Sequence, residues 1–309
     1  MTANPLHGVS SAIRGWTPIL CLSFGVPLLA AGFATPNELN RRATIPAWCI
    51  SWGLIFAFFG AMKWLTWRRT SAPNVSPWRQ MGYLFFWPGL DAPTFLRGTA
   101  ARDAPVDPRE GVIALGKLLL GAALFWGVAR WVPNDLPLVQ GWVGLAGLAI
   151  GLLGGAFHFA SWLWRAGGVD AEPIMDAPLR ARSMAEFWGL RWNRAFHDFV
   201  RRFIHRPIAR RFGPTTATTA VFLFSGLLHD TILSIPAGAG YGRPTLYFLL
   251  QLVGLAIERS PFGKRLAVGR GLCGRLFAIA VIVGPAGLLF HRPFMERVWL
   301  PFMSAVQAS

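Results

Sequence analysis

Long apolar runs constrain the fold of this chain more than any other feature. A helix needs about 20 apolar residues to cross roughly 30 Å of hydrocarbon, and it satisfies its backbone polar groups internally. The candidate spans run over approximately 16–33, 45–62, 111–132, 138–164, 215–235, 241–257 and 272–290. The sequence therefore predicts an all-α polytopic membrane protein with about seven transmembrane helices, forming one integral membrane domain over residues 1–309.

Composition supports this reading and excludes a soluble globule. The chain is 53% hydrophobic and 14% charged, whereas soluble domains carry about 25% charged residues, and its mean hydropathy is +0.42. The run at 241–257 is the shortest. The first run ends at Gly32-Phe33-Ala34, where small residues have the spacing that a cleavable signal peptide also shows. Further spans follow at once, so a retained helix is favoured.

The positive charge is placed as membrane topology requires. The net charge is +16, which in a soluble domain would suggest nucleic acid. Most of the Lys and Arg residues instead lie in the connections 63–117, 165–211 and 259–275. Nucleic-acid binding is therefore not expected. The positive-inside rule puts these connections and the N-terminus in the cytoplasm, and richness in Ala, Arg and Gly suggests a bacterial inner membrane.

Two connections are too long to be simple turns. The first, residues 64–110, contains the apolar stretch 81–91, which reads as a re-entrant or interfacial segment. In the second, 183–205 has helical periodicity, which predicts an amphipathic helix on the cytoplasmic membrane surface, stopped by Pro207. Asn193 and His197 lie on the flank of its apolar stripe and are expected to face the protein interior. The stripe consists of Trp188, Trp192, Phe196, Phe199 and Phe203.

Two ionisable residues, His229 and Asp230, lie inside the apolar run at 215–235. A central Asp costs about 2.5–3.5 kcal/mol even on the lenient insertion scale, so such residues normally face a cavity or a partner. Ser225 and Gly226, one turn earlier, leave room for a ligand. The plainer alternative is a packing histidine that is hydrogen-bonded to a neighbouring carbonyl, with Asp230 near the outer interface.

Two motifs occur together in this region. The stretch from Glu186 to Asn193 reads EFWGLRWN, and the stretch from Ser225 to Asp230 reads SGLLHD. The pair resembles the plant-type wax synthase branch of the membrane-bound O-acyltransferase superfamily, in which F-W-x-x-x-W-N precedes S-G-x-x-H-E. The resemblance covers about 182–259, with weaker markers at 87–89 and 290–294. This chain has Asp230 where a glutamate is usual.

The resemblance implies a fold and a reaction. The fold would be that of the superfamily, and the reaction would move an acyl group from acyl-coenzyme A to the hydroxyl of a lipophilic alcohol. A long-chain alcohol giving a wax ester is the first expectation, although related fungal proteins acetylate sterol or terpenoid alcohols. His229 would be the general base, and Asn193 would donate to the developing oxyanion or orient the imidazole.

Further residues are expected to contact substrate. Arg191 and Arg194 would bind the phosphates of coenzyme A. Alternatively, they follow only from the positive-inside rule and contact anionic lipid headgroups. The substrate-binding candidates are Trp188, Trp192, His197, Ser225, Asp230, Arg191 and Arg194.

Other chemistry is less compatible with the sequence. The six histidines form no HxxxH or HxxHH box, and the three cysteines form no CxxC pair, so neither a metal site nor a disulfide is expected. No cofactor besides the acyl-coenzyme A substrate is expected. Ser225 lacks a GxSxG elbow. The alternatives are a proton- or ion-coupled transporter that uses His229 and Asp230, and a catalytically silent scaffold.

Overall fold

The computed structural model describes residues 45–70, 74–99 and 106–308, and every extended regular element in these ranges is a helix. Ordinary α-helical segments alternate with π-helical ones, which are labelled η, together with one 3-10 turn. The isolated bridge between Thr99 and Val169 is the one β-type pairing in the described ranges. The predicted all-α fold is confirmed for this part of the chain.

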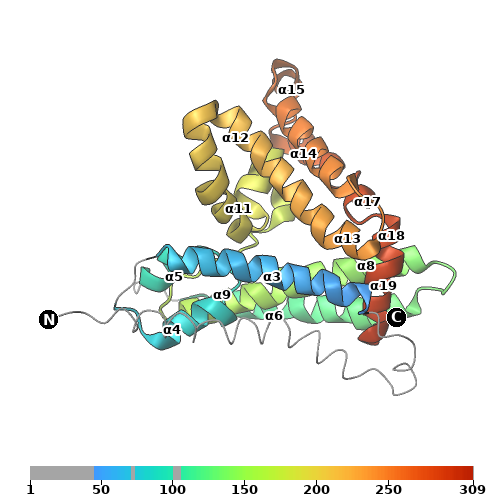
Figure 1. The fold of residues 1–309 in the computed structure, drawn as a ribbon, viewed down its shortest axis with the longest axis horizontal. Coiled ribbons are helices and arrows are strands. Elements are labelled where there is room, and N and C mark those ends of the chain that lie inside the picture. The colour runs from blue at the N-terminus through green and yellow to red at the C-terminus, as the bar shows by residue number, and fades with distance from the viewer. Residues whose placement is uncertain (1–44, 71–73, 100–105, 309) are drawn as a thin grey trace.

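The first half of the described chain forms a layer of long helices that run alongside one another (Figure 1). Segments η2 and η3 continue α6 and α8, which gives unbroken helical stretches over Pro108–Trp131 and Pro137–Ala166. The elements of this half are α3 (Ala47–Arg68), α4 (Pro77–Met81), η1 (Gly82–Phe86), α5 (Ala92–Arg97), α6 (Pro108–Ala122), η2 (Ala123–Val128), α7 (Ala129–Trp131), α8 (Pro137–Leu148), η3 (Ala149–Ala156) and α9 (Phe157–Ala166).

The second half rises from this layer as an inclined group that includes α12 and α14 (Figure 1). Its elements are η4 (Pro178–Arg180), α10 (Met184–Glu186), η5 (Phe187–Arg191), α11 (Arg194–Val200), η6 (Arg201–His205), α12 (Arg206–His229), η7 (Asp230–Ser234), α13 (Ile235–Ala237), α14 (Arg243–Arg259), α15 (Pro261–Arg265), α16 (Gly271–Val283), α17 (Ala286–Leu289), α18 (Arg292–Phe294), η8 (Met295–Trp299) and α19 (Leu300–Ala305).

Within the described residues, 5 helical stretches are long and apolar enough to cross a bilayer. They correspond to the predicted spans at 45–62, 111–132, 138–164, 215–235 and 272–290. The predicted span at 241–257 is the 17-residue helix α14, which is not among the 5, and the predicted span at 16–33 lies outside the described residues. The stretches that qualify are Ala47–Arg68, Pro108–Trp131, Pro137–Ala166, Arg194–Ala237 and Gly271–Leu289.

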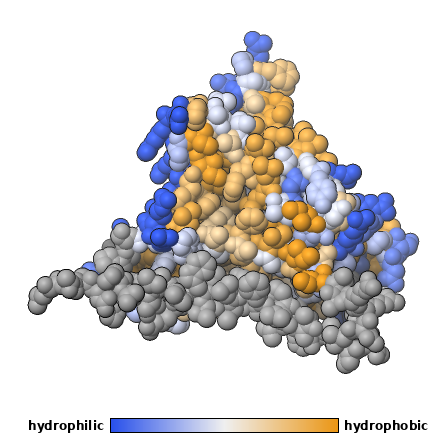
Figure 2. Space-filling view, viewed as in Figure 1, coloured by the Kyte–Doolittle hydropathy of each residue, from blue (hydrophilic) through white to orange (hydrophobic). Residues whose placement is uncertain are grey.

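The exterior of the helices is apolar. Figure 2 shows hydrophobic residues gathered over the inclined helices, with hydrophilic residues toward the two sides of the view. Leu227 on α12, Val253 on α14 and Val283 on α16 are all exposed. Soluble monomers rarely expose contiguous apolar surface on this scale. The helices and their apolar exterior are therefore those of an integral membrane protein.

The predicted amphipathic helix over 183–205 is wrong in two respects. The segment breaks at Trp192, which is extended, and at Asn193, which has φ 43°. It also does not stop at Pro207, because η6 runs on into α12 with helical backbone at His205 and Arg206, and Pro207 lies within this helical stretch. The real break comes at Gly213, where φ is 85° just before Pro214.

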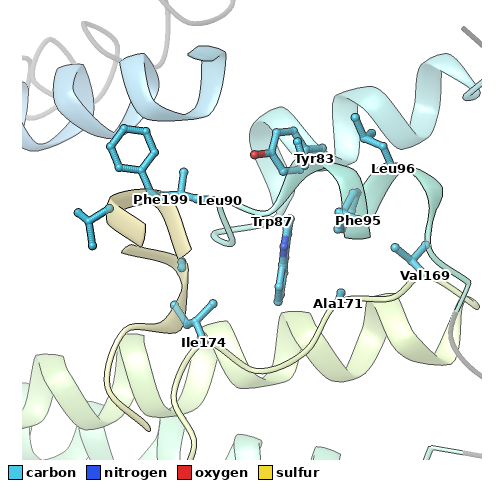
Figure 3. Packing of buried hydrophobic residues seen from close by; sticks show 12 residues of the cluster. Tyr83, Trp87, Leu90, Phe95, Leu96, Val169, Ala171, Ile174 and Phe199 are labelled. Carbon is cyan, nitrogen blue, oxygen red and sulfur yellow. The ribbon is translucent and has the colours of Figure 1, made fainter. Parts of the chain in front are cut away.

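Part of the stretch 81–91 packs inside the protein, whereas Met81 and Phe86 are exposed. Tyr83, Trp87 and Leu90 are buried in one apolar cluster with Phe95 and Ile174 (Figure 3). Lys63 of α3, only 2% exposed, donates to the carbonyl oxygen of Gly89 and lies 3.6 Å from the centroid of the Tyr83 ring. An N–H group that points at an aromatic face is electrostatically favourable. This contact fixes the segment against α3.

Candidate active site

His229 is the last residue of α12, and its ring is held in one orientation. Its Nδ1 lies 2.7 Å from the carbonyl oxygen of Ser225, one turn earlier. A carbonyl only accepts hydrogen bonds, so Nδ1 carries the hydrogen and, in the neutral ring, Nε2 carries the lone pair. No hydrogen bond joins Nε2 to another described residue. The half-buried imidazole thus presents a basic nitrogen that the protein does not occupy.

Aromatic side chains surround this imidazole. The His229 ring lies 4.7 Å from the ring of Phe248 on α14, measured between centroids. Phe248 in turn lies 5.9 Å from Trp188 of η5, and Trp188 lies 6.0 Å from Phe222 of α12. The Trp188 indole nitrogen is buried without a partner. The structure therefore brings Trp188 and His229 to the same aromatic cluster, through a phenylalanine that sequence reasoning missed.

Ser225 acts on His229 through its backbone. Its hydroxyl donates to the carbonyl oxygen of Val221 at 2.9 Å, and its own carbonyl accepts from His229. A serine hydroxyl that is bonded back into its helix is already partly satisfied. The geometry assigns Ser225 an orienting role.

Asp230 joins the end of α12 to the start of α14. One carboxylate oxygen accepts from the hydroxyl of Ser234 and the amide of Gly242, both at 2.9 Å. The other accepts from the Thr245 amide at 3.1 Å and from the Thr245 hydroxyl. Amide groups at a helix N-terminus favour a negative charge. Asp230 thus serves as the cap of α14, with its oxygens already occupied by protein donors.

Gly226 permits close contact between α12 and α14. A β-carbon at this position would lie 2.7 Å from the Thr245 α-carbon, so the two backbones would have to separate. We expect Gly226→Ala to destabilise the protein by about 1–3 kcal/mol, as overpacking does, and to lower activity because Phe248 would move away from His229. Thermal unfolding and an activity assay measure both. Gly116→Ala, where a β-carbon meets nothing within 4 Å, is the matched control and should lower neither, since alanine is favoured over glycine inside a helix.

His291 completes the buried network behind Asp230. It is 0% exposed; its Nε2 lies 3.1 Å from the Ser234 hydroxyl oxygen, and its Nδ1 accepts from the Phe294 amide at 3.2 Å. Because Nδ1 accepts, Nε2 carries the hydrogen and donates to Ser234, which donates to Asp230. Burial, and secondarily the Arg243 cation, lower the pKa of His291 below its usual value of 6.5.

This lowered pKa predicts acid sensitivity. The unfolded chain binds a proton at His291 below about pH 6.5, whereas the folded protein resists protonation, so stability falls as pH drops through this range. His291→Gln should lose stability at pH 7 but show a shallower decline between pH 7 and pH 5. Thermal unfolding of both proteins in detergent across this interval measures the difference. Parallel pH profiles would contradict the assignment.

Asn193 shapes the loop before α11. Its side-chain oxygen accepts from the Phe196 amide at 3.2 Å, which caps α11. Asparagine tolerates the left-handed conformation found here better than most residues. Phe196 stacks on Phe224 of α12, with centroids 6.3 Å apart, so α11 does pack on α12. No hydrogen bond joins Asn193 to His229, and a catalytic role for Asn193 stays a prediction.

The predicted phosphate-binding arginines are already paired. Arg191 lies 2.6 Å from the Glu186 carboxylate, which also accepts from the Arg182 amide at 2.7 Å. That backbone hydrogen bond, and then the Arg191 partner, outweigh burial and lower the pKa of Glu186. Arg194 pairs with Glu172. Both arginines therefore have carboxylate partners in this structure, and their contacts with coenzyme A stay predictions.

The remaining predicted side chains, Trp192 and His197, also have protein partners. Trp192 stacks on Phe187 with centroids 5.4 Å apart, and it is half-buried. His197 lies 3.4 Å from the Asp198 carboxylate, with 31% of its side chain exposed. Neither contacts His229 in the described part of the chain. Their substrate-binding roles stay predictions.

A cavity of about 270 Å³ lies beside the cluster of Figure 3, on the side of α11. Its charged lining consists of Asp91, Asp170, Glu172, Asp198 and Arg194. Burial, and then Glu172 and Asp91, raise the pKa of Asp170. This lining repels anions, so it does not suit the phosphates of coenzyme A. In residues 45–70, 74–99 and 106–308, no His, Cys, Asp and Glu side chains gather in a way that suits a metal ion.

Comparison with known protein families finds a match over part of the chain. The profile described as "Membrane bound O-acyl transferase family" matches residues 171–250, which run from the loop before α10 to the middle of α14 and contain His229, Trp188 and Phe248. The resemblance to the membrane-bound O-acyltransferase superfamily is therefore confirmed over these residues.

The individual relatives described below are named as long-chain-alcohol O-fatty-acyltransferases, which supports the resemblance to the wax synthase-like branch. "Probable long-chain-alcohol O-fatty-acyltransferase 9" of Arabidopsis thaliana is 30% identical over 142 residues, 42% of this chain and 42% of the relative. "Probable long-chain-alcohol O-fatty-acyltransferase 7" of the same plant is 29% identical over 40% of each chain. "Long-chain-alcohol O-fatty-acyltransferase" of Simmondsia chinensis is 26% identical over 40% of this chain and 38% of its own. The chain matches about two fifths of the length of these relatives.

Proposed function

We propose that this protein transfers an acyl group from acyl-coenzyme A to the hydroxyl of a lipophilic alcohol. The observation that carries the proposal is the His229–Ser225 hydrogen bond, which leaves Nε2 as a free base inside an aromatic cluster. The names of the curated relatives, all long-chain-alcohol O-fatty-acyltransferases, support the same reaction class.

The proposed reaction needs two proton transfers, one to His229 and one from it. The alcohol donates its proton to Nε2 of His229 while its oxygen attacks the thioester carbonyl. The carbon–sulfur bond then breaks, and the departing thiolate takes the proton back from Nε2. The ester and free coenzyme A are the products, and the imidazole returns to its starting state.

The surroundings of His229 favour a lipophilic acceptor. Leu223 and Leu227 lie exposed on α12 within two turns of the histidine. An alkyl chain gains about 0.8 kcal/mol per CH₂ on leaving water and little on leaving lipid, so such an alcohol enters laterally from the bilayer. A long-chain alcohol is therefore the first acceptor to test.

We further propose that coenzyme A approaches from the end of the bundle that carries the C-terminus of α3 and the C-terminus of α9. These ends lie together in Figure 1, opposite the start of α8, and carry Arg68 and Arg165. By the positive-inside rule this end faces the cytoplasm. The relatives are plant proteins, and a bacterial inner membrane stays a prediction from composition.

A direct assay tests the proposed function. The purified protein in lipid nanodiscs receives labelled hexadecanoyl-coenzyme A and a panel of alcohols of increasing length, and ester is measured by chromatography. We expect ester with long-chain alcohols and little with ethanol. Ion flux into proteoliposomes without ester formation would instead support the transporter alternative, against which the occupied oxygens of Asp230 already argue.

A further inference from the structure

Two buried side-chain atoms in the described part of the chain have no hydrogen-bond partner. They are the indole nitrogen of Trp188 and the amide oxygen of Gln251. The great majority of buried polar groups in folded proteins are paired, so each of these is unusual. One is a donor and the other an acceptor.

The free atom of Gln251 is fixed by its other contact. Gln251 lies in α14 with 0% of its surface exposed, and its amide nitrogen donates to the carbonyl oxygen of Val281 on α16 at 2.8 Å. Reversing the amide would place its oxygen against that carbonyl, and two acceptors do not bond. The unpaired atom is therefore an acceptor.

Both atoms belong to one interface. Phe248, Gln251, Leu255 and Glu258 share the buried face of α14 at helical spacing. The segment from α10 to η5 lies over this face, because Trp188 packs on Phe248 and the amide of Met184 donates to Glu258 at 2.5 Å. Gln251 lies between Phe248 and Glu258 along α14. The ring of Phe248 also packs against the ring of His229.

The chemistry of the pair selects its ligand. A donor and an acceptor together suit a group that both accepts and donates, which means a hydroxyl or a secondary amide. In the proposed reaction the acceptor alcohol has one hydroxyl proton, and it goes to Nε2 of His229. Gln251 must then receive its hydrogen from another group.

We infer that Trp188 and Gln251 bind a secondary amide in the arm of the acyl thioester. The amide carbonyl accepts from the Trp188 indole and the amide N–H donates to Gln251. Coenzyme A carries such an amide two carbons from its sulfur, close enough to bind beside a thioester at His229. The inference rests on the proposed function and makes these two side chains specificity determinants for the donor.

Two donors, one with the acetamido group of the arm and one without it, test the inference. S-hexadecanoyl-N-acetylcysteamine contains the amide, and S-hexadecanoyl-ethanethiol lacks it. Each is supplied with hexadecanol to the full-length protein in nanodiscs, and the ratio of the two kcat/KM values is measured. Wild type should prefer the amide-bearing donor by about fivefold or more, and Gln251→Leu and Trp188→Phe should each reduce that preference about threefold to tenfold. Tyr247→Phe is the matched control, because that hydroxyl on the same face already donates to Ile282, and it should keep the preference.

The inference would be overturned if the ratio of the two kcat/KM values were the same in wild type and in both variants. It would also be overturned if the variants slowed both donors alike, which is the result expected if a buried water joins the two atoms. Binding of the unreactive thioethers S-hexadecyl-N-acetylcysteamine and ethyl hexadecyl sulfide, measured by the shift in unfolding temperature, separates the two proposals. If wild type forms no ester but binds the amide-bearing thioether more tightly, and Gln251→Leu loses this binding preference, the amide site is retained and the proposed function is removed. If Gln251→Leu does not fold, the same ratio in Trp188→Phe decides.

Discussion

His229→Gln is expected to slow ester formation by about 10²- to 10⁴-fold, the range that general-base catalysis contributes. Glutamine keeps a polar side chain near the Ser225 carbonyl but has no basic nitrogen, so binding should change less than kcat. The measurement is a turnover assay with acyl-coenzyme A and hexadecanol at equal folded yield, judged by size-exclusion chromatography. The loss should appear in kcat and not in KM.

His205→Ala is the matched control. His205 precedes the same helix, is half-buried, and has its one side-chain hydrogen bond in the described chain with Thr218 at 3.5 Å. It should retain wild-type turnover. Ester formation that continues undiminished in His229→Gln would show that the imidazole does not accept the proton, and the mechanism would have to be abandoned.

Asp230→Ala is expected to lower the free energy of unfolding by about 2–4 kcal/mol, because several donors then lose a charged acceptor. They are the Ser234 hydroxyl, the Gly242 and Thr245 amides and the Thr245 hydroxyl. The start of α14 would detach from α12, and activity would fall with stability. Thermal or denaturant unfolding in detergent measures the effect.

Two further variants sharpen this result. Asp230→Glu keeps the charge on a longer arm and should lose less than Asp230→Ala. Glu296→Ala removes a carboxylate from the Arg292–Glu296 pair, which is exposed to solvent and contributes little to stability, and serves as the control. An Asp230→Ala protein that is as stable as wild type but inactive would assign the carboxylate to chemistry instead of to the cap.

The sequence predicted most of the fold because apolar length is a local signal. Residues 111–132 and 138–164 needed no partner to be recognised as spans. The segment 183–205 was predicted as one helix because its apolar period is real, but the tertiary structure turns the chain at Asn193. An asparagine in the left-handed conformation does not interrupt the apolar period, so the sequence pattern does not reveal the turn at this residue.

The site was predicted in part for a related reason. His229 and Trp188 stand in short motifs, and the structure brings both to Phe248. Phe248 itself is one aromatic among many, so nothing in the sequence singles it out. The one signal for Gln251 was an amide inside the apolar run 241–257. The capping role of Asp230 depends on Gly242 and Thr245, which only the fold places beside it.

The protonation of His229 tests the central claim most directly. Nitrogen-15 NMR of ring-labelled histidines in the detergent-solubilised protein, with His229→Gln used to assign the signals, reports which nitrogen carries the hydrogen. The structure predicts a neutral ring at pH 7.5 with the hydrogen on Nδ1 and an unprotonated Nε2. A hydrogen found on Nε2 in the resting protein would contradict the account, since that nitrogen then has no lone pair to accept the alcohol proton.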